Sequence, residues 1–286
     1  MRPDDWYLID DLPEFLARAG EFLRSRPALH TVPLTVTEGL RTRGADIYGD
    51  EAPYFGVLER EGTVRAAYFR TPPHPLQVTP LTSEGADSLA VHLAGLGRPL
   101  PSVSGEVGTA AALARAWRRH TDRTAKPVER SRLYRLGTLT VPQPWPAGRA
   151  RVAGEADRDQ LERWYREFTE AIGGGAPQRA ERWAETRIAS GGLTLWEDGD
   201  GTPLSMAGTT PMVAGQLRVA PVYTPAPLRG RGYAGAVTAE VSRAAQTAGA
   251  DEVLLFADLA NPTSNALYRR IGYRPVADFA VYAFAA

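Results

Sequence analysis

The sequence of 286 residues contains no cysteine and only four histidines. The absence of cysteine excludes disulfide bonds, a thiolate nucleophile and zinc sites built on cysteine, and it fits an intracellular protein. The histidines are His30, His74, His92 and His120, and all four lie in the N-terminal half. We therefore expect no metal site, and no histidine base in the C-terminal half.

The chain also lacks a net charge and a long apolar run. Its 33 basic and 33 acidic residues cancel, so no overall charge attracts nucleic acid or an anionic membrane. No stretch approaches the roughly 20 apolar residues that span a bilayer, and no apolar signal-peptide core follows the acidic N-terminus. We expect a soluble cytoplasmic protein that binds neither nucleic acid nor membranes.

A proline cluster predicts the boundary between two domains. Pro142, Pro144 and Pro146 follow a strand-like run at 132–141. Proline restricts its own backbone and that of the preceding residue, so the cluster predicts a semi-rigid linker. The predicted domains are 1–142 and 143–286, which agrees with the usual domain size.

Hydrophobic periodicity predicts a similar order of elements in both domains. In the first, a helix near 12–22 precedes strands at 54–61, 63–69 and 76–78 and helices near 83–95 and 109–120. In the second, helices at 157–172 and 177–190 precede strands at 193–197, 204–212 and 216–223. A helix ending at Gly249, a strand at 253–257, a helix at 262–271 and a strand at 280–284 follow. The shared order predicts a duplicated α/β (α+β) domain.

The segment 229–235, RGRGYAG, lies between an extended apolar segment and a long amphipathic helix. Glycines let the backbone approach a ligand, and the unpaired amides and positive dipole at a helix start attract anions. The segment therefore predicts a phosphate-binding loop. Two motifs fit it: Gly230-x-Gly232-x-x-Gly235 is typical of dinucleotide binding, and Arg229-x-x-Gly232-x-Ala234 is typical of acyl-CoA pyrophosphate loops.

Position in the chain argues against the dinucleotide motif. That motif follows its strand almost directly, whereas the extended stretch 224–228 separates this turn from the strand. Asp258 has the spacing of a ribose-binding carboxylate, but too few residues follow it to complete a doubly wound sheet. The acyl-CoA loop is the better interpretation.

A second motif, DLANPTSNALYRRIGY at 258–273, follows the loop after one helix and one strand. The two motifs, in this order, resemble those of the GNAT (Gcn5-related N-acetyltransferase) superfamily, and the resemblance covers about 147–286. It implies tandem GNAT-like domains, each a mixed, mostly antiparallel twisted sheet flanked by helices. The first domain would be degenerate, and the second would be a catalytic acetyltransferase domain with acetyl-CoA as co-substrate.

The resemblance also implies which residues bind acetyl-CoA. Asn261 precedes Pro262 as a helix N-cap, and the resemblance adds a contact with pantetheine. The backbone of the central strand would pair with pantetheine, the loop would hold the pyrophosphate, and the second motif would complete the site. The implied residues are Val222, Tyr223 and Thr224; Arg229, Gly230, Arg231, Gly232, Tyr233, Ala234 and Gly235; and Asn261, Ser264 and Asn265.

The resemblance implies that Tyr268 is the general acid that protonates the departing thiolate. Ser264 and Tyr268 lie four residues apart, so they share one helix face. Many relatives carry a glutamate base on the central strand, but 216–222 reads QLRVAPV and offers no acid. The remaining base candidates are Glu167, Glu170 and Asp258, and the alternative is a water chain or the substrate's own ionisation.

We therefore predict an acetyl-CoA-dependent N-acetyltransferase that acts on a primary amine of a small molecule or an amino terminus by direct attack on the thioester. Two alternatives stay open: a non-catalytic acyl-CoA-binding or regulatory module, and an aminoacyl transferase of the same fold. The N-terminal half has no glycine before Gly85 in its corresponding turn and carries Glu84 there, so we expect it to bind no CoA. Such a half could imitate a second subunit, which makes a monomer or a homodimer the expected state.

Overall fold

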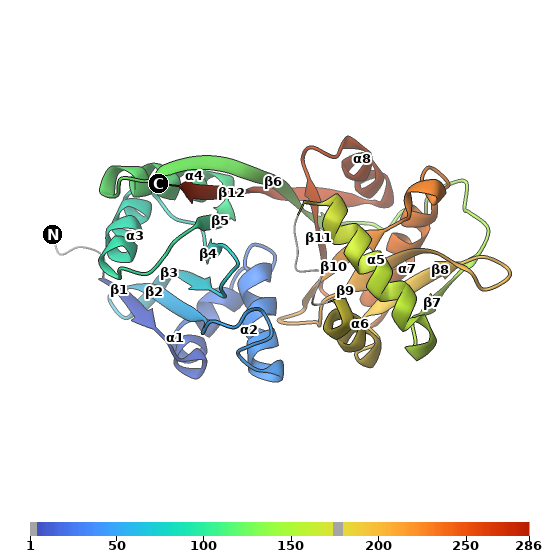
Figure 1. Cartoon of the computed structure of the whole chain (residues 1–286), viewed down its shortest axis with the longest axis horizontal. Coiled ribbons are helices and arrows are strands. Elements are labelled where there is room, and N and C mark those ends of the chain that lie inside the picture. The colour runs from blue at the N-terminus through green and yellow to red at the C-terminus, as the bar shows by residue number, and fades with distance from the viewer. Residues whose placement is uncertain (1–4, 174–179, 286) are drawn as a thin grey trace. The chain divides into compact units, whose positions relative to one another are not determined.

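The computed structural model describes residues 5–173 and 180–285. It divides into two compact units that are not contiguous in sequence (Figure 1). Unit 1 comprises Met1–Leu133, Ala257–Asn261 and Pro275–Ala286, and unit 2 comprises Tyr134–Phe256 and Pro262–Arg274. The short segments Ala257–Asn261 and Pro275–Ala286 matter because strands from late in the sequence extend through them into unit 1.

Unit 1 begins with an edge strand and two helices. Asp11 starts α1 by accepting a hydrogen bond from the Glu14 amide, and Phe15, Ala19 and Leu23 form the buried face of that helix. Its elements are β1 (Asp5–Ile9), α1 (Leu12–Arg24), α2 (Thr31–Arg43), β2 (Tyr54–Arg60), β3 (Thr63–Arg70), β4 (Leu76–Val78), α3 (Ser83–Gly95), β5 (Ser102–Glu106), α4 (Val107–His120) and β6 (Thr124–Leu136).

Unit 2 repeats this order of elements, as the sequence predicts. The central strand β10 has the predicted bounds, and so does the last helix α8, which starts at Pro262. The elements of this second repeat are β7 (Arg149–Val152), α5 (Arg158–Ala171), α6 (Ala180–Ala189), β8 (Leu193–Glu197), β9 (Pro203–Thr209), β10 (Gln216–Tyr223), α7 (Tyr233–Thr247), β11 (Glu252–Asp258), α8 (Pro262–Ile271) and β12 (Tyr273–Ala285), and most of β12 belongs to unit 1.

The strand order is β1-β2-β3-β4-β5-β12-β6 in unit 1 and β7-β8-β9-β10-β11 in unit 2. Strand β4 is parallel to β5, and β10 is parallel to β11. The recorded neighbours β1–β2, β2–β3, β3–β4, β7–β8, β8–β9 and β9–β10 are antiparallel. The mixed, mostly antiparallel α+β fold predicted from the sequence is confirmed.

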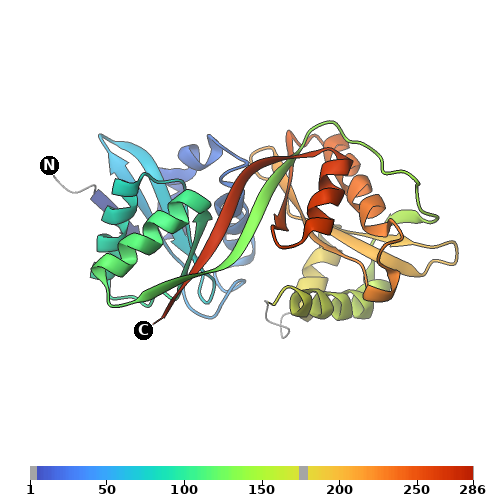
Figure 2. The ribbon, with the colours of Figure 1, turned by 90° about the horizontal axis from the view of Figure 1, so that it is seen from above.

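The last strand differs from the sequence-based expectation. A short strand at 280–284 was predicted to complete the domain 143–286, but β12 has thirteen residues and continues into unit 1. It pairs antiparallel with β5, with Phe279 opposite Glu106 and Ala283 opposite Ser102, and Figure 2 shows it beside β6. Sequence periodicity cannot reveal this, because it reports which residues form a strand and not which strand they pair with.

Each unit has its own hydrophobic core. In unit 2, Leu161 and Trp164 of α5 pack against Leu195, Met206 and Tyr223 of the sheet. Tyr223 is the last residue of β10, so this core fixes the strand end where the candidate site begins.

Candidate functional site

The strands β10 and β11 separate at their carboxyl ends. Their parallel pairing covers only Gln216–Arg218 opposite Glu252–Leu254, although β10 continues to Tyr223 and β11 to Asp258. Backbone groups of β10 beyond Arg218 that face β11 are therefore not used in that ladder. Such an opening admits an extended ligand that pairs with the strand.

The end of β10 is held by side chains from its neighbours. A register shift lies between Val219 and Val222 against β9. The buried Ser205 hydroxyl donates to the Tyr223 carbonyl at 2.9 Å and lies 2.8 Å from the Thr224 hydroxyl. Arg229 Nε donates to the Thr224 carbonyl at 3.0 Å. Since Tyr223 turns its carbonyl to β9, Val222 turns its backbone groups toward the opening.

This arrangement refines the expectation that Val222, Tyr223 and Thr224 all pair with an added strand. The carbonyls of Tyr223 and Thr224 already accept hydrogen bonds from Ser205 and Arg229. By the alternation of backbone groups along a strand, Val222 is the remaining candidate of the three for pairing with a ligand. The sequence could not identify Ser205, which carries no motif and acts only because β9 lies beside β10.

The glycine loop opens helix α7 with unpartnered amides. Gly230 and Gly232 have φ of +77° and +88°, a region that favours glycine. Gly232 is the N-cap of α7 and, as a glycine, makes no side-chain cap hydrogen bond. A Cβ built on Gly230 would meet nothing within 4 Å, and one on Gly232 would meet only Pro146 at 3.7 Å or more. The loop therefore offers backbone N–H groups and open space, which are what an anion-binding site requires.

The corresponding helix of unit 1 starts differently. In α3 the Thr82 hydroxyl accepts from the Gly85 amide at 3.1 Å, and Glu84 lies in the first turn. A side-chain cap uses one free amide, and the carboxylate repels anions. Of the two helices, α7 alone has the start that a phosphate needs.

The other loop residues differ in their exposure to solvent. Arg229 and Arg231 are exposed, whereas Tyr233 and Ala234 are half-buried. Gly235 is buried, and a Cβ there would lie 3.1 Å from Leu267 Cδ1 of α8. The structure thus gives Gly235 a packing role between α7 and α8, which its place in a motif does not reveal.

Tyr268 lies in the interior of unit 2, on the buried face of α8. Its ring meets that of Tyr273 edge-on, with centroids 6.1 Å apart. Burial raises the pKa of the Tyr268 hydroxyl to about 12, so the group is protonated at neutral pH. That state suits a proton donor.

The other residues of the second motif lie around the start of α8. Asn265 Oδ1 accepts a hydrogen bond of 2.7 Å from the buried Tyr134 hydroxyl, which ties α8 to β6. Ser264 is half-buried on the same helix. Asn261 is exposed, and its backbone N–H donates to the backbone carbonyl of Asp258 at 3.0 Å. The Asn265 side chain therefore has a structural partner besides any ligand.

The three base candidates have different environments. Glu167 Oε2 of α5 accepts from the Tyr223 hydroxyl at 2.7 Å, beside the end of β10. Glu170 is exposed on the same helix. Asp258 is exposed, and its Oδ1 accepts from the Ala260 amide at 2.8 Å, which stabilises the turn before α8. Glu167 is joined to the central strand by this hydrogen bond.

Aromatic rings surround the Glu167–Tyr223 pair. The Tyr223 ring lies 6.1 Å from Trp164 and 6.4 Å from Phe168, both on α5. Burial and the neighbouring Glu167 raise the pKa of Tyr223 to about 12, so Tyr223 donates the proton of this hydrogen bond. The sequence predicted Tyr223 only as a backbone partner of pantetheine, and its side-chain contact with Glu167 carries no sequence signal.

Two further features concern metals and membranes. Within residues 5–173 and 180–285, no group of three or more histidine, cysteine, aspartate or glutamate side chains is placed to hold a metal ion. The described helices include none that is long and apolar enough to cross a membrane. The glycines at 174 and 175, which follow Gly173, lie outside the described residues.

Comparison with known proteins identifies the fold. Residues 214–281, from before β10 into β12, match the family model "FR47-like protein". A GCN5-related N-acetyltransferase from Sphaerobacter thermophilus has a similar structure at 19% identity and a TM-score of 0.64, covering 99% of this chain and 96% of that one. A GNAT-family acetyltransferase from Colwellia psychrerythraea reaches 0.60 at 13% identity, with 98% of each chain covered.

A third similar structure is a tandem GNAT protein from the clavulanic acid biosynthesis pathway, at 12% identity and a TM-score of 0.56, with 98% of each chain covered. No curated protein matches the sequence. The chain therefore has a tandem GNAT fold, and the resemblance drawn from its two motifs is confirmed.

Proposed function

We propose that the protein is an acetyl-CoA-dependent N-acetyltransferase whose unit 2 transfers an acetyl group to a primary amine of a small molecule or an amino terminus. The observation that carries this proposal is the uncapped, glycine-led start of α7 next to the separated ends of β10 and β11. A GNAT fold alone is compatible with many activities, so the proposal rests on this site.

The residues present fit an acyl-CoA. The loop amides at 230–235 bind the pyrophosphate, and Arg229 and Arg231 add positive charge. Arg229 Nε donates to the Thr224 carbonyl, which holds the guanidinium beside the loop. The Val222 backbone binds the pantetheine amides, and Asn261 and Ser264 complete the pantetheine site.

Bound acetyl-CoA supplies the acetyl group as a thioester, which the amine attacks directly. A bond forms between the amine nitrogen and the carbonyl carbon, the carbon–sulfur bond breaks, and the ammonium formed loses a proton. Glu167 accepts that proton, and Tyr223 positions its carboxylate. Tyr268 donates a proton to the leaving sulfur, and its burial keeps that proton in place until the step occurs.

Calorimetric titration with acetyl-CoA, followed by a thiol-release assay over a panel of primary amines, tests the proposal. We expect binding in a one-to-one ratio and release of CoA thiol with at least one amine. Absence of binding would contradict the proposal. Binding without turnover on any amine would favour the non-catalytic acyl-CoA module, and turnover only with an aminoacyl-tRNA donor would favour the aminoacyl transferase.

A further inference from the structure

The backbone ladder between β9 and β10 is irregular near the end of β10. Val219 lies opposite Thr209 and Val222 lies opposite Ala207, so β10 has one extra residue between these two pairs. Pro221 lies in this stretch and has no N–H to donate. A bulge of this kind interrupts the ladder, so the residues beyond it depend on other partners for their position.

The buried Ser205 of β9 provides those partners. Its hydroxyl donates to the Tyr223 carbonyl at 2.9 Å, which uses its single proton. The Thr224 hydroxyl, 2.8 Å from Ser205 Oγ, is therefore the donor in the second bond. Ser205 has no exposed surface, so water does not replace either bond. One hydroxyl thus fixes the backbone at residues 223 and 224.

Two groups of the proposed site are attached to the backbone at this point. The Tyr223 hydroxyl donates to Glu167 Oε2 at 2.7 Å, and the Thr224 carbonyl accepts from Arg229 Nε at 3.0 Å. Burial and Glu167 raise the pKa of Tyr223, whereas the positive charge of Arg229 lowers it, so the guanidinium lies near the same hydroxyl. The candidate base and the first residue of the phosphate loop are therefore both held by the segment that Ser205 fixes.

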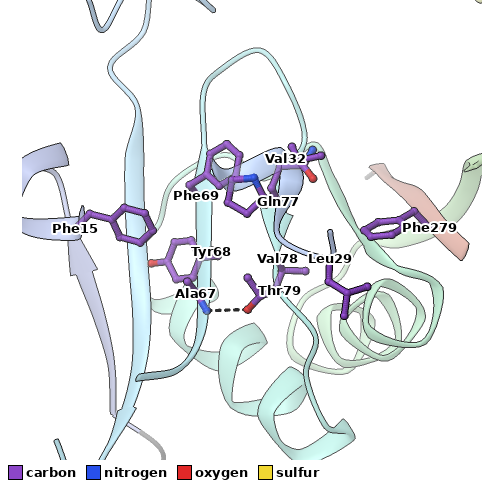
Figure 3. Close-up of a pocket in the computed structure, with 11 residues that line it drawn as sticks. Phe15, Leu29, Val32, Ala67, Tyr68, Phe69, Gln77, Val78, Thr79 and Phe279 are labelled. Atoms are coloured by element: carbon purple, nitrogen blue, oxygen red, sulfur yellow. Dashed lines mark hydrogen bonds between the residues drawn. The ribbon is translucent and has the colours of Figure 1, made fainter. Parts of the chain in front are cut away.

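Unit 1 carries an alanine at the place that corresponds to Ser205. Strand β4 corresponds to β10, because each is antiparallel to the strand before it and parallel to the strand after it. Ala67 and Ser205 each precede the residue that lies opposite the last residue of that strand. In unit 1 the Thr79 hydroxyl accepts directly from the Ala67 amide at 2.9 Å (Figure 3). This strand end is held without a serine.

The space beside the strand end also differs between the units. In unit 1 the cavity that Phe15, Tyr68 and Phe279 line in Figure 3 has a volume of about 20 Å³, which is room for one water molecule. In unit 2 the strand end lies where β10 and β11 separate. The serine is therefore found at the strand end that opens toward a ligand, and an alanine at the one that does not.

We propose that Ser205 is a positioning residue that couples acetyl-CoA binding to the placement of the base. Its hydroxyl fixes the backbone from which the Tyr223 side chain holds Glu167 and the Thr224 carbonyl anchors Arg229. This inference rests on the proposed function, since it assigns a role within the same site. Ser205 itself touches neither the acetyl donor nor the amine.

Ser205→Ala tests the proposal, because it removes the shared hydroxyl and gives unit 2 the residue that unit 1 has. We expect kcat to fall about tenfold and the Kd for acetyl-CoA to rise about tenfold, since one hydrogen bond is worth roughly that factor. Kinetics at saturating acetyl-CoA measure kcat, and calorimetry measures Kd. Native values of both constants, or a change in only one, would overturn the proposal.

Ser242→Ala is the matched control. Ser242 of α7 is also fully buried, donates to the Thr238 carbonyl at 2.6 Å and lies 2.7 Å from the Tyr273 hydroxyl. The two variants lose the same kinds of bond in the same unit, so their melting temperatures should fall by similar amounts. Only Ser205→Ala should change kcat and Kd. Equal kinetic losses in both variants would show a general effect of core destabilisation and would contradict the proposal.

The route from Ser205 to the base is tested in a Glu167→Gln background. If Ser205 acts on kcat through Glu167, adding Ser205→Ala should lower kcat by less than about twofold there, because coupled residues are not additive. The Kd for acetyl-CoA should still rise about tenfold, because that effect passes through Arg229. A tenfold loss of kcat in both backgrounds would contradict the coupling.

Two conservative variants keep the proposal testable if Ser205→Ala does not fold. Ser205→Thr keeps the hydroxyl on a side chain that suits a strand, and it should retain both native constants. Ser205→Cys keeps the size with a weaker donor, and it should change each constant about threefold in the direction expected for alanine. Native constants in Ser205→Cys would contradict the proposal.

The native protein separates the two levels of the argument. Absence of acetyl-CoA binding, or of turnover on any amine, would refute the proposed function and this inference together. Native activity that Ser205→Ala leaves unchanged would refute this inference alone.

Discussion

At the scale of single residues, the proposed function gives opposite proton tasks to two groups of unit 2. Tyr268 is buried on α8 and holds its proton firmly, whereas Glu167 receives a hydrogen bond from Tyr223 next to the central strand. The motif implied Tyr268 from the sequence. It left Glu167, Glu170 and Asp258 equivalent, because the contact that separates them joins residues 56 positions apart.

Tyr268→Phe tests the proton donor. The variant should bind acetyl-CoA normally and turn over about 100-fold more slowly, because general acid catalysis is typically worth that much or more. Tyr273→Phe is the matched control, since it removes a hydroxyl from the adjacent buried ring, where Tyr273 is paired with Ser242. Steady-state kinetics decide the point, and turnover of Tyr268→Phe at the native rate would rule out the role.

The raised pKa of Tyr268 also predicts a pH dependence of stability. Its value rises from 10.0 to about 12 on folding, so the hydroxyl adds stability that is complete below pH 10 and is lost between pH 10 and 12. The free energy of unfolding, measured in urea from pH 9 to 11, should fall less steeply for Tyr268→Phe than for the native protein. Identical slopes would show that the hydroxyl is solvated.

Glu167→Gln tests the proton acceptor. We expect about 100-fold lower kcat/KM with unchanged acetyl-CoA affinity, because an amide cannot take the proton from the amine. Tyr223→Phe should cost about tenfold, the worth of one positioning hydrogen bond.

Glu170→Gln and Asp258→Asn are the controls for this test. Glu170 is exposed, and asparagine keeps the side-chain oxygen that accepts from the Ala260 amide. Both variants should retain native kinetics. Loss of activity in either one, with Glu167→Gln active, would transfer the base role to that residue.

At the scale of elements, the difference between α7 and α3 separates the two units chemically. Both helices follow a strand that is paired in parallel with the next one. One starts at a left-handed glycine without a side-chain cap, and the other starts at Thr82 with its own cap and an acid in the first turn. Local sequence predicted this difference because capping depends on a few adjacent residues.

Gly232→Glu should abolish acetyl-CoA binding, because it places a carboxylate at the pyrophosphate and strains a backbone with φ of +88°. Gly249→Glu is a closely matched control: Gly249 also has φ of +88°, lies beyond the other end of α7 and has open space around it. Both should lose roughly 1–2 kcal/mol of stability from the left-handed backbone. Calorimetry should show binding only in the Gly249 variant, and equal affinities would disprove the assignment of the loop.

At the scale of the whole molecule, the two compact units do not follow the division at residue 142. The last strand β12 pairs with β5, so residues from the end of the chain complete the sheet of unit 1. Phe284 also packs on Trp117 of α4, with ring centroids 5.6 Å apart. A strand that lacks its neighbour exposes a row of unpaired backbone groups.

A fragment of residues 1–142 should therefore unfold without a cooperative transition. Adding a peptide of residues 273–286 should restore cooperativity, and a scrambled peptide of the same composition should not. Circular dichroism during heating measures the transition. Cooperative unfolding of the fragment alone would show that β12 is dispensable for unit 1.

The sequence by itself determined the bounds of several elements and the glycine-led start of α7, although it did not predict β1, α2 and β7. Strand β10 and helix α8 have their predicted bounds, and Gly230 and Gly232 adopt the left-handed geometry that their motif needs. These features depend on backbone preferences and on side chains within one turn, so they can be predicted from neighbouring residues.

Only the tertiary structure decided which residues far apart in the sequence come into contact. It gave β12 to the sheet of unit 1, joined Glu167 to Tyr223, placed Ser205 on the Tyr223 carbonyl and set Gly235 against Leu267. Each of these contacts joins residues far apart in the chain. They form because strand pairing and core packing select among partners that the sequence pattern leaves equivalent.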